Sequence, residues 1–497
     1  MQVTERNSSE QPCIQTDLPL MGKALRFGHQ HPWVYDLIKI SSIAGTVLAA
    51  ETALRFVPRN WRWAVGLSAV SCALVYQKLL SPILGILFPQ RHDKACRAYP
   101  TTTSPVGSLK WSGDVPILSI DMSRPYEAGH FHGTTLSEGL REIRSTIQFA
   151  LKTLAREDGH ECYPKTIEQI IQQLPDEIME ELRGIVDGYN SAIPKGLLVQ
   201  EPALTVEELI LLHLHPDRVH FSPKVSEGLM DPESFHGNER PYGGIACTTI
   251  IDGDEETGPI VGRNLDWQTF GITGKWSVLI NRVNPATGTA TMEASIPGFV
   301  GVLSGINRHG LNLSMNVAFG VTRSLRGLPA VFFNRIALDS CTSVGEVVEL
   351  AKRSPPLGPY HLTLADKEAG ASLSFYQNDG NTHTLRAWQP KQALVTTNCN
   401  YHPVLGNHMH RRWSQERQSA AEQLHDRKVR DMSPQMLDYN VYAQIVRKAL
   451  ALPLINNQRT THSIIFHPKR GNLEVGFDNC FAGSEPREVL DLRQYLA

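Results

Sequence analysis

A cysteine, an arginine and an aspartate share one short stretch near the middle of the chain. This stretch, CTTIIDGDEETGPIVGRNLDW, begins at Cys247 and includes Arg263 and Asp266. A cysteine nucleophile needs a base that takes its proton, and that base is usually histidine. The stretch contains no histidine. The residues therefore indicate either an ordinary buried cysteine or a nucleophile whose base has another origin.

Cutting the peptide bond between Ala246 and Cys247 would supply such a base. The freed α-amine has a reference pKa of about 7.7–8.0, which suits proton exchange at neutral pH. An internal cysteine can cut this bond by attacking the preceding carbonyl, and two glycines just upstream would give the backbone freedom to strain it. We expect Asp266 to hold the new α-ammonium. We expect Arg263 to lower the pKa of the thiol and to stabilise a negative intermediate.

The composition excludes several other classes of protein. The chain has 497 residues, of which 41% are hydrophobic and 20% are charged, and its formal net charge is -2. A nucleic-acid binder would carry a basic excess, which this chain lacks. The eight cysteines include no CxxC pair and no zinc-finger spacing, so we expect neither a metal nor a disulfide scaffold. No organic cofactor is expected either.

The first part of the chain differs from the rest. Residues 1–33 are polar and are predicted to be disordered, with no cleavable signal peptide. Residues 34–92 are predicted to form an apolar helical region, but charges such as Lys78 keep every uncharged run below the roughly 18 residues of a spanning helix. Two arrangements fit this pattern: association with a membrane, or a buried helical hairpin. Residues 93–114 are rich in Thr, Ser, Pro and Gly, which favours a linker.

The remainder is predicted to be one large body with helices first and strands later. Pro116–Ile120 is typical of a short strand, and apolar residues recur at helical spacing over 136–154. Thr205 and Glu208 have the spacing of a capping box. From Cys247 onward, alternating segments separated by turns predict a series of antiparallel hairpins. This order favours an α+β fold in which helices cover packed sheets.

The stretch from Cys247 to Trp267 resembles the N-terminal signature of the linear-amide C–N hydrolases. This group of N-terminal nucleophile hydrolases includes acid ceramidase, N-acylethanolamine acid amidase, bile salt hydrolase and penicillin V acylase, and isopenicillin N acyltransferases are relatives. The matching features are a Cys-Thr pair, a turn, and Gly-Arg-Asn-hydrophobic-Asp-aromatic. The resemblance implies that Cys247 is the nucleophile and that Arg263 and Asp266 are its partners.

The same resemblance implies a fold and a processing step. The fold would be the four-layer αββα sandwich of these hydrolases. Autocatalytic cleavage would separate a helical pro-segment, residues 115–246, from a catalytic domain, residues 247–497. The break would fall between Ala246 and Cys247.

Two further stretches resemble parts of the family's catalytic site. ALVTTNCNYHPVLGNHMHRRW implies that Asn398 donates to the oxyanion and that Arg411 is a functional arginine. GLNLSMNVAFG implies that Asn316 binds the oxyanion or the substrate. The next residue is Val317, where ceramidase-like members carry an acidic residue, so the chain departs from the ceramidase pattern there.

We therefore expect a cysteine amidase that acts on a linear amide, with an N-acyl lipid similar to ceramide or an N-acylethanolamine as substrate. Two alternatives are acyl transfer of the isopenicillin N acyltransferase type and an inactive, membrane-anchored binding protein. His132 could pair with Cys247 as in papain-like enzymes, but its Gly-rich setting, GHFHG, favours a packing role. The expected location is membrane-associated or cytoplasmic.

Overall fold

The computed structural model describes most of the chain from residue 99 onward. The described ranges are 99–154, 163–193, 202–214, 245–267, 272–318, 327–354, 357–375, 383–399, 401, 412–457, 459–478, 481–484 and 487–497. They belong to one compact unit, His92–Ala497. The predictions for residues 1–33 and 34–92 lie outside these ranges. Among the described helices, none has the length and apolar character needed to cross a membrane.

A ten-stranded sheet forms the larger of two β layers. Its strands, in spatial order, are β1 (Thr102–Ser104), β2 (Gly107–Ser112), β3 (Val115–Asp121), β6 (Val278–Asn284), β7 (Thr289–Ser295), β8 (Ser304–Asn307), β9 (Asn312–Val317), β10 (Tyr360–Ala365), β11 (Gly370–Phe375) and β12 (His383–Ala387). Neighbours run antiparallel except β3 and β6, which run parallel. Two of the antiparallel hairpins predicted after Cys247 are confirmed as β6–β7 and β8–β9.

A six-stranded antiparallel sheet forms the second β layer and carries Cys247. Its strands, in spatial order, are β13 (Leu394–Thr396), β4 (Ile245–Asp252), β5 (Ile260–Trp267), β14 (Thr460–His467), β15 (Asn472–Phe477) and β16 (Glu488–Asp491). The predicted strand, turn and strand after Cys247 are confirmed as β4 and β5. Gly253 and Gly258 have positive φ angles of 139° and 67° in the turn between them, where a side chain would be strained.

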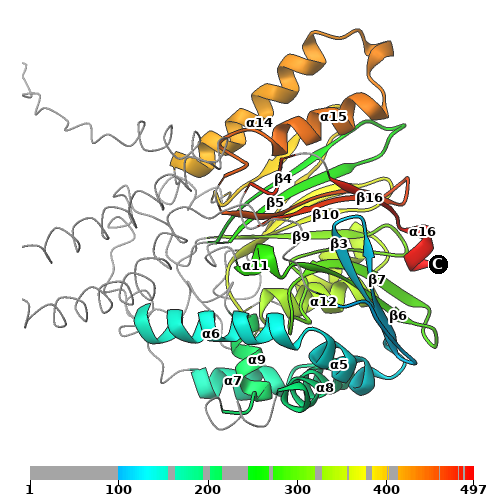
Figure 1. Cartoon of the computed structure of the whole chain (residues 1–497). Coiled ribbons are helices and arrows are strands. Elements are labelled where there is room, and N and C mark those ends of the chain that lie inside the picture. Colours follow the sequence, from blue (N-terminus) through cyan, green and yellow to red (C-terminus); the bar gives the residue numbers. More distant parts are fainter. Residues whose placement is uncertain are drawn as a thin grey trace, which may run out of the picture. The chain divides into compact units, whose positions relative to one another are not determined.

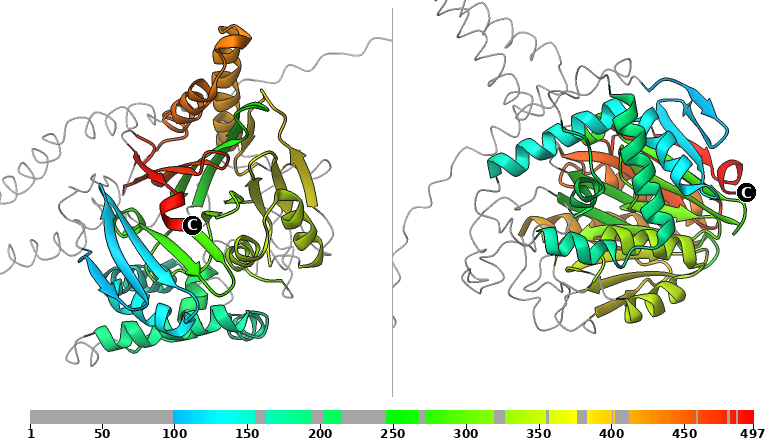
Figure 2. Two further views of the ribbon diagram at one scale, coloured as in Figure 1. Left: turned by 90° about the vertical axis from the view of Figure 1, so that its right-hand side faces the viewer. Right: turned by 90° about the horizontal axis from the view of Figure 1, so that it is seen from below.

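Helices cover the outer face of each sheet, so the described body has four layers (Figures 1 and 2). On the six-stranded sheet lie α14 (Arg412–Arg430) and α15 (Tyr439–Leu450). Beside the ten-stranded sheet lie α5 (Pro125–Thr135), α6 (Ser137–Leu154), α7 (Tyr163–Ile171), α8 (Asp176–Ala192), α9 (Val206–His213), α12 (Ala330–Ser340) and α13 (Val344–Arg353). The predicted mixed α+β class is confirmed. Buried apolar side chains such as Ile251, Met292 and Phe466 fill the space between the sheets.

The linker expected at residues 93–114 is wrong for residues 102–112, which form β1 and β2. The hairpin turns between Ser104 and Gly107, and β2 then pairs along its full length with β3. Leu109 in β2 is completely buried in the core. The Thr, Ser, Pro and Gly that suggested a linker therefore belong to a tight hairpin and its edge strand. Because β3 pairs with β6, residues on both sides of Cys247 share one sheet.

Glycines allow helices α5 and α8 to cross in close contact. A Cβ atom on Gly129 would lie 2.2 Å from the carbonyl oxygen of Glu181, and one on Gly133 would lie 2.2 Å from that of Ile185. Gly184 and Gly188 make the reciprocal approach from α8. The GHFHG motif therefore serves helix packing, the role that its glycine-rich sequence favoured.

Two buried histidines from the helical layer accept hydrogen bonds from the backbone between β7 and β8. His132 Nε2 accepts from the N–H of Gly298 at 2.9 Å, and His213 Nε2 accepts from the N–H of Val300 at 2.8 Å. Both rings must therefore be unprotonated at Nε2. Burial lowers the pKa of His132 to about 3 and that of His213 to about 4. His132 thus has a packing role, and its Nε2 is occupied by the Gly298 N–H.

We expect acid to destabilise this body through the two histidines. In the unfolded chain each takes up a proton near pH 6.5, whereas in the folded chain each stays neutral to a lower pH. Their contribution to the free energy of unfolding is fully present above about pH 6.5. It is lost as the pH falls towards 4, by roughly 3 kcal/mol for each histidine. Urea unfolding at about pH 7 and 4.5 measures this loss. The variant His213→Gln should show a weaker pH dependence, and an unchanged dependence would contradict this explanation.

Candidate active site

Cys247 lies near the start of β4, completely buried and facing the ten-stranded sheet. In the β4–β5 pair, Cys247 is opposite Leu265 and Thr249 is opposite Arg263. Arg263 Nη2 donates to Cys247 Sγ at 3.4 Å. Cys247 and Arg263 are sixteen residues apart in the chain, and the β4–β5 turn brings their side chains into contact.

The guanidinium of Arg263 is held by groups from three other strands. It donates to the hydroxyl of Ser304 on β8, to the carbonyl of Met315 on β9 and, at 3.1 Å, to His462 Nε2 on β14. Burial lowers the pKa of Arg263, yet a guanidinium keeps its charge in proteins. A fixed positive group therefore faces the sulfur of Cys247.

The thiol of Cys247 is nonetheless held in its protonated form in this state. Burial raises the pKa of the thiol, and this effect outweighs the opposing charge of Arg263. A protonated thiol is a weak nucleophile and needs a base to activate it. The structure therefore holds the sulfur in place beside a positive group that would stabilise a thiolate.

Asp266 is fixed by hydrogen bonds from the first residue of β14 and from the loop just before it. Thr460 Oγ1 donates to Asp266 Oδ1 at 2.6 Å, and Asn457 Nδ2 donates to Asp266 Oδ2 at 2.7 Å. Burial raises the pKa of the carboxyl group, and the charge of Arg417 opposes this rise. The register of β4 and β5 places Asp266 opposite Ala246, beside the peptide bond expected to break. Its contact with a freed α-ammonium stays a prediction.

Asn398 lies directly against the nitrogen of Cys247. The Cys247 N–H donates to Asn398 Oδ1 at 3.0 Å, and Asn398 Nδ2 donates to the carbonyl of Val317 at 2.7 Å. Arg417 also donates to Asn398 Oδ1, at 2.8 Å. Two donors on one side and a carbonyl on the other fix the orientation of this amide. The amide oxygen thus faces Cys247, and donation to an oxyanion stays a prediction.

The other two residues implied by resemblance are not seen beside the sulfur. Thr249 Oγ1 donates to Asn316 Oδ1 at 2.8 Å, and Asn316 Nδ2 donates to the Thr396 carbonyl at 2.8 Å. Asn316 therefore joins β9 to β4 and β13, and it binds β4 two residues away from Cys247. Its role stays a prediction. Arg411 lies outside the described residues. Within the described ranges, no group of three or more His, Cys, Asp or Glu side chains could hold a metal ion.

Comparison with known proteins finds several that this chain resembles. Residues 253–479 match the family model described as "Acyl-coenzyme A:6-aminopenicillanic acid acyl-transferase", and this range includes Arg263, Asp266 and Asn398. Acid ceramidase of Mus musculus is 23% identical over 328 residues, which cover 60% of this chain and 73% of that protein. The chain is related to the N-terminal nucleophile amide hydrolases.

The other matches cover less of the chain or agree weakly in structure. Acid ceramidase of Pan troglodytes is 25% identical over 178 residues, which cover 31% of this chain and 45% of that protein. The Caenorhabditis elegans ortholog of N-acylethanolamine-hydrolyzing acid amidase has 18% identity and a TM-score of 0.35, covering 45% of this chain and 93% of that one. A mutant of conjugated bile acid hydrolase from Clostridium perfringens has 12% identity and a TM-score of 0.35, covering 50% and 93%.

The structure adds Arg417, which sequence reasoning missed, to the candidate site. From α14, Arg417 donates to the Cys247 carbonyl, to Thr248 Oγ1 at 2.8 Å and to Asn398. Its guanidinium also lies 4.5 Å from the ring centre of Trp413. In the structure, Ser414, Arg417 and the other buried residues of α14 recur at three- and four-residue spacing and so share one face of the helix. A buried arginine is almost always paired with polar or acidic groups, so a partner for Arg417 is expected.

His462 is the second missed residue, and a β-bulge places it. The register of β14 against β5 shifts between Thr460 and His462, so Thr460 pairs with Asp266 while His462 pairs with Leu265. Burial, reinforced by the charge of Arg263, lowers the pKa of His462 well below its usual value. A neutral ring can accept the hydrogen bond from Arg263. The bulge thus places Thr460 against Asp266 and His462 against Arg263.

Replacing His462 with leucine should lower activity by leaving one Arg263 donor without its acceptor. A lost buried partner costs about 1–3 kcal/mol, so we expect kcat/KM for amide hydrolysis to fall about tenfold. The pH–rate profile should also shift, because Arg263 opposes the high pKa of the thiol. His462→Gln, which retains an acceptor, is the control and should recover part of the rate. Equal activity in all three proteins would show that His462 has no positioning role.

Proposed function

We propose that this protein is an autoprocessing cysteine amidase that hydrolyses the linear amide bond of an N-acyl compound. One observation carries the proposal: Cys247 faces Arg263 through its sulfur and Asn398 through its nitrogen. Any buried backbone N–H needs an acceptor, but an ordinary core cysteine needs no guanidinium at its sulfur. The relation to amide hydrolases supports the same chemistry.

The first step is cleavage of the chain by its own cysteine. Cys247 Sγ attacks the carbonyl carbon of Ala246, the C–N bond breaks, and the proton of the thiol passes to the leaving nitrogen. The product is a thioester between Ala246 and the sulfur. Water then hydrolyses this thioester, which leaves a carboxylate on Ala246 and a free thiol and α-amine on Cys247. No oxidant, metal or second protein takes part.

The second step is turnover of the amide substrate. The α-amine of Cys247 takes the proton of the thiol, and the thiolate attacks the substrate carbonyl. The resulting oxyanion is stabilised by a donor, which the resemblance assigns to Asn398 and Asn316. The ammonium returns its proton to the departing amine. Water, deprotonated by the same α-amine, then releases the acyl group from sulfur as a carboxylic acid.

The surrounding residues position these groups. Asn398 Oδ1 already accepts from the Cys247 nitrogen, so it can keep the freed amine directed at the sulfur. Arg417 holds Asn398 Oδ1, and Asp266 supplies a nearby carboxylate for the ammonium. Arg263 stabilises the thiolate. The chemistry therefore needs only side chains and the new α-amine, without a metal or an organic cofactor.

The substrate we propose is an N-acyl lipid similar to ceramide or an N-acylethanolamine. The match to acid ceramidase over 73% of that protein supports this class. Val317 departs from the acidic residue of ceramidase-like members, which favours an N-acyl lipid other than ceramide. An apolar region at residues 34–92 would bring such an enzyme close to a membrane, where these substrates are found.

Acyl transfer to an amine is the second candidate, because the matching family model carries the name of an acyl-transferase. Both reactions share the acyl-thioester on Cys247 and differ only in whether water or an amine accepts the acyl group. Product analysis with an added amine acceptor separates them. An N-acyl product that exceeds the free acid at low amine concentration would favour the transferase. A catalytically inactive, membrane-anchored binding protein is the third candidate, and the retained site residues count against it.

Intact mass and N-terminal sequencing of the purified protein test the proposal. We expect a fragment that begins at Cys247, together with release of free acid from N-acyl amides. A chain that stays whole at every pH tested would overturn the self-cleavage step and the α-amine mechanism with it. Failure to react with any cysteine-directed acyl probe would favour the inactive binding protein.

A further inference from the structure

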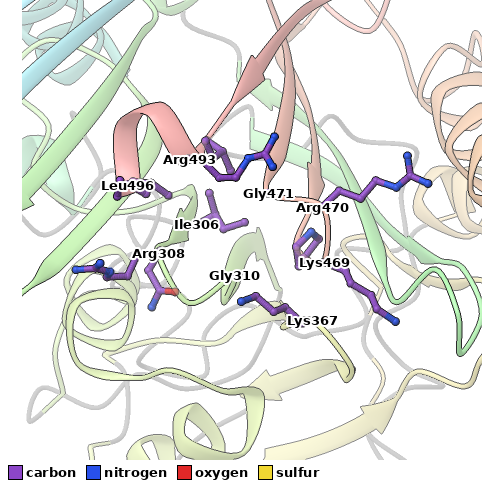
Figure 3. Close-up of a pocket in the computed structure, with 13 residues that line it drawn as sticks. Ile306, Arg308, Gly310, Lys367, Lys469, Arg470, Gly471, Arg493 and Leu496 are labelled. Carbon is purple, nitrogen blue, oxygen red and sulfur yellow. The ribbon is translucent and has the colours of Figure 1, made fainter.

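A basic pocket lies among turns at the ends of strands from both sheets (Figure 3). Its volume is about 410 Å³, within the range of small-molecule sites. The walls come from the turns β8–β9, β10–β11 and β14–β15 and from the short helix α16 (Arg493–Leu496). The cationic side chains that line the basic pocket are Arg308, Lys367, Lys469, Arg470 and Arg493.

The basic pocket is separate from the proposed active site. Strand β14 begins at Thr460, which binds Asp266, and ends at His467, next to the pocket residue Pro468. Seven strand steps of about 3.3 Å correspond to roughly 20 Å. A small ligand in the basic pocket would therefore not touch Cys247.

Two glycine turns bring cationic side chains close to the cavity. Gly310 has a φ of 88°, and a Cβ atom there would lie 3.2 Å from two side-chain carbons of Lys367 and 3.0 Å from the Pro468 carbonyl oxygen. Gly471 has a φ of 69°, and its Cβ would lie 3.7 Å from Arg493 Cγ. The stems of Lys367 and Arg493 thus lie against Gly310 and Gly471, two turn positions that carry no side chain.

The pocket concentrates positive charge in a chain whose net charge is -2. Among the described residues that line it, five side chains are cationic and none is a carboxylate, while the last residue, Ala497, places its main-chain carboxylate at the same wall. Lys469 donates to the Glu256 carbonyl at 2.7 Å and Arg308 donates to the Gly288 carbonyl at 2.6 Å, and these neutral acceptors leave both charges in place. Arg493 is the exception, because it also pairs with Asp491 at 2.8 Å.

Apolar side chains complete the basic pocket beside the charges. Ile306 is buried on β8, and Leu492 and Leu496 are buried at α16. A ligand that suits this lining carries a multivalent anionic group and a less polar portion. Several lysine and arginine donors around one cavity match the oxygens of a phosphate group better than a single carboxylate.

We propose that the basic pocket binds a phosphate-bearing small molecule or the phosphate of a lipid headgroup. The proposal concerns a second site and stands whether or not Cys247 performs amide hydrolysis. Occupancy would join three turns of both sheets through one ligand. Binding should weaken as the salt concentration rises, since exposed charges attract the ligand.

Calorimetry with inorganic pyrophosphate on the full chain tests the proposal. We expect saturable binding by the wild type, and binding at least about tenfold weaker in the double variant Lys367→Gln, Arg493→Gln, which loses two charged donors. The matched control is Arg427→Gln, Arg430→Gln, which removes two exposed charges from α14 and should bind like the wild type. Equal loss in both double variants, or no saturable binding by the wild type, would overturn the proposal.

Vesicles identify the source of the phosphate. The same proteins are sedimented with phosphatidylcholine vesicles that contain or lack phosphatidic acid. Loss of the phosphatidic-acid-dependent binding in the Lys367, Arg493 variant, with retention in the control, assigns a lipid headgroup. Equal sedimentation of all three proteins, combined with selective loss of pyrophosphate binding in the Lys367, Arg493 variant, assigns a soluble phosphate compound. Because neither measurement depends on amide hydrolysis, failure of the proposed enzyme activity leaves both readouts valid.

Discussion

Replacing Cys247 with alanine should leave the chain whole and abolish amide hydrolysis. The substitution removes the sulfur that attacks Ala246, and without that attack the α-amine base never forms. Both the nucleophile and its base are therefore lost together. We expect the rate of hydrolysis to fall by at least about 10⁴-fold, to the level of the uncatalysed background. Intact mass and release of free acid from an N-acyl amide measure the two effects separately.

The control for this variant is Cys341→Ala. Cys341 is also a buried free thiol, but it follows α12 and accepts no contact from Arg263. The Cys341→Ala variant should be cleaved and should hydrolyse amides like the wild type. Cleavage of Cys247→Ala at the same bond would show that another group performs the cut. Retained hydrolysis in that variant would remove Cys247 from the mechanism.

The local part of this site was predictable from the sequence because one hairpin builds it. Cys247, Arg263 and Asp266 lie on two strands joined by an acidic turn that contains two glycines of positive φ. Alternation along a strand then determines which side chains share a face. The contact of Arg263 with Cys247 follows from this short-range geometry. Asn398 lies 151 residues from Cys247, and only a resemblance could bring it to the site in advance.

The parts that sequence reasoning missed depend on packing between distant elements. Arg417 reaches Cys247 because α14 lies on the six-stranded sheet, and no local pattern shows which helix covers which strand. Resemblance to the family instead pointed to Arg411. His462 faces Arg263 because one strand irregularity changes the register of β14. A one-residue change in register reverses which side chains face inward, and sequence periodicity does not reveal it.

The misassigned linker has a different cause. Residues such as Thr and Ser suit both linkers and edge strands, and the turn at Pro105 reads like a break in structure. The deciding contact is long-range, since β3 pairs with β6 more than 150 residues later. The parallel pairing also shows why the fate of the segment before Cys247 matters. After cleavage, β1, β2 and β3 would still be paired with the sheet of the catalytic chain.

Replacing Arg417 with methionine should have the second largest effect on activity. Arg417 binds the Cys247 carbonyl, Thr248 and Asn398, so its loss frees the groups that orient the nucleophile. Loss of a preorganised charged donor at a catalytic site typically costs about 10²–10³ in rate, and we expect that decrease in kcat/KM. Arg427→Met on the exposed face of the same helix is the control. Arg411→Met tests the arginine that the resemblance implied, and a larger loss of activity there than in Arg417→Met would reverse the assignment.

The pH dependence of the Arg417→Met variant separates an electrostatic role from a purely structural one. In the wild type, burial raises the pKa of Asp266 and the charge of Arg417 opposes that rise. Without Arg417, the pKa of Asp266 should be higher still, so its carboxylate is lost at a higher pH. The acid limb of the kcat/KM profile should therefore move to higher pH in the variant. An acid limb at the wild-type position, with the rate lowered equally at every pH, would show that Arg417 acts only by holding Asn398 and Cys247 in place.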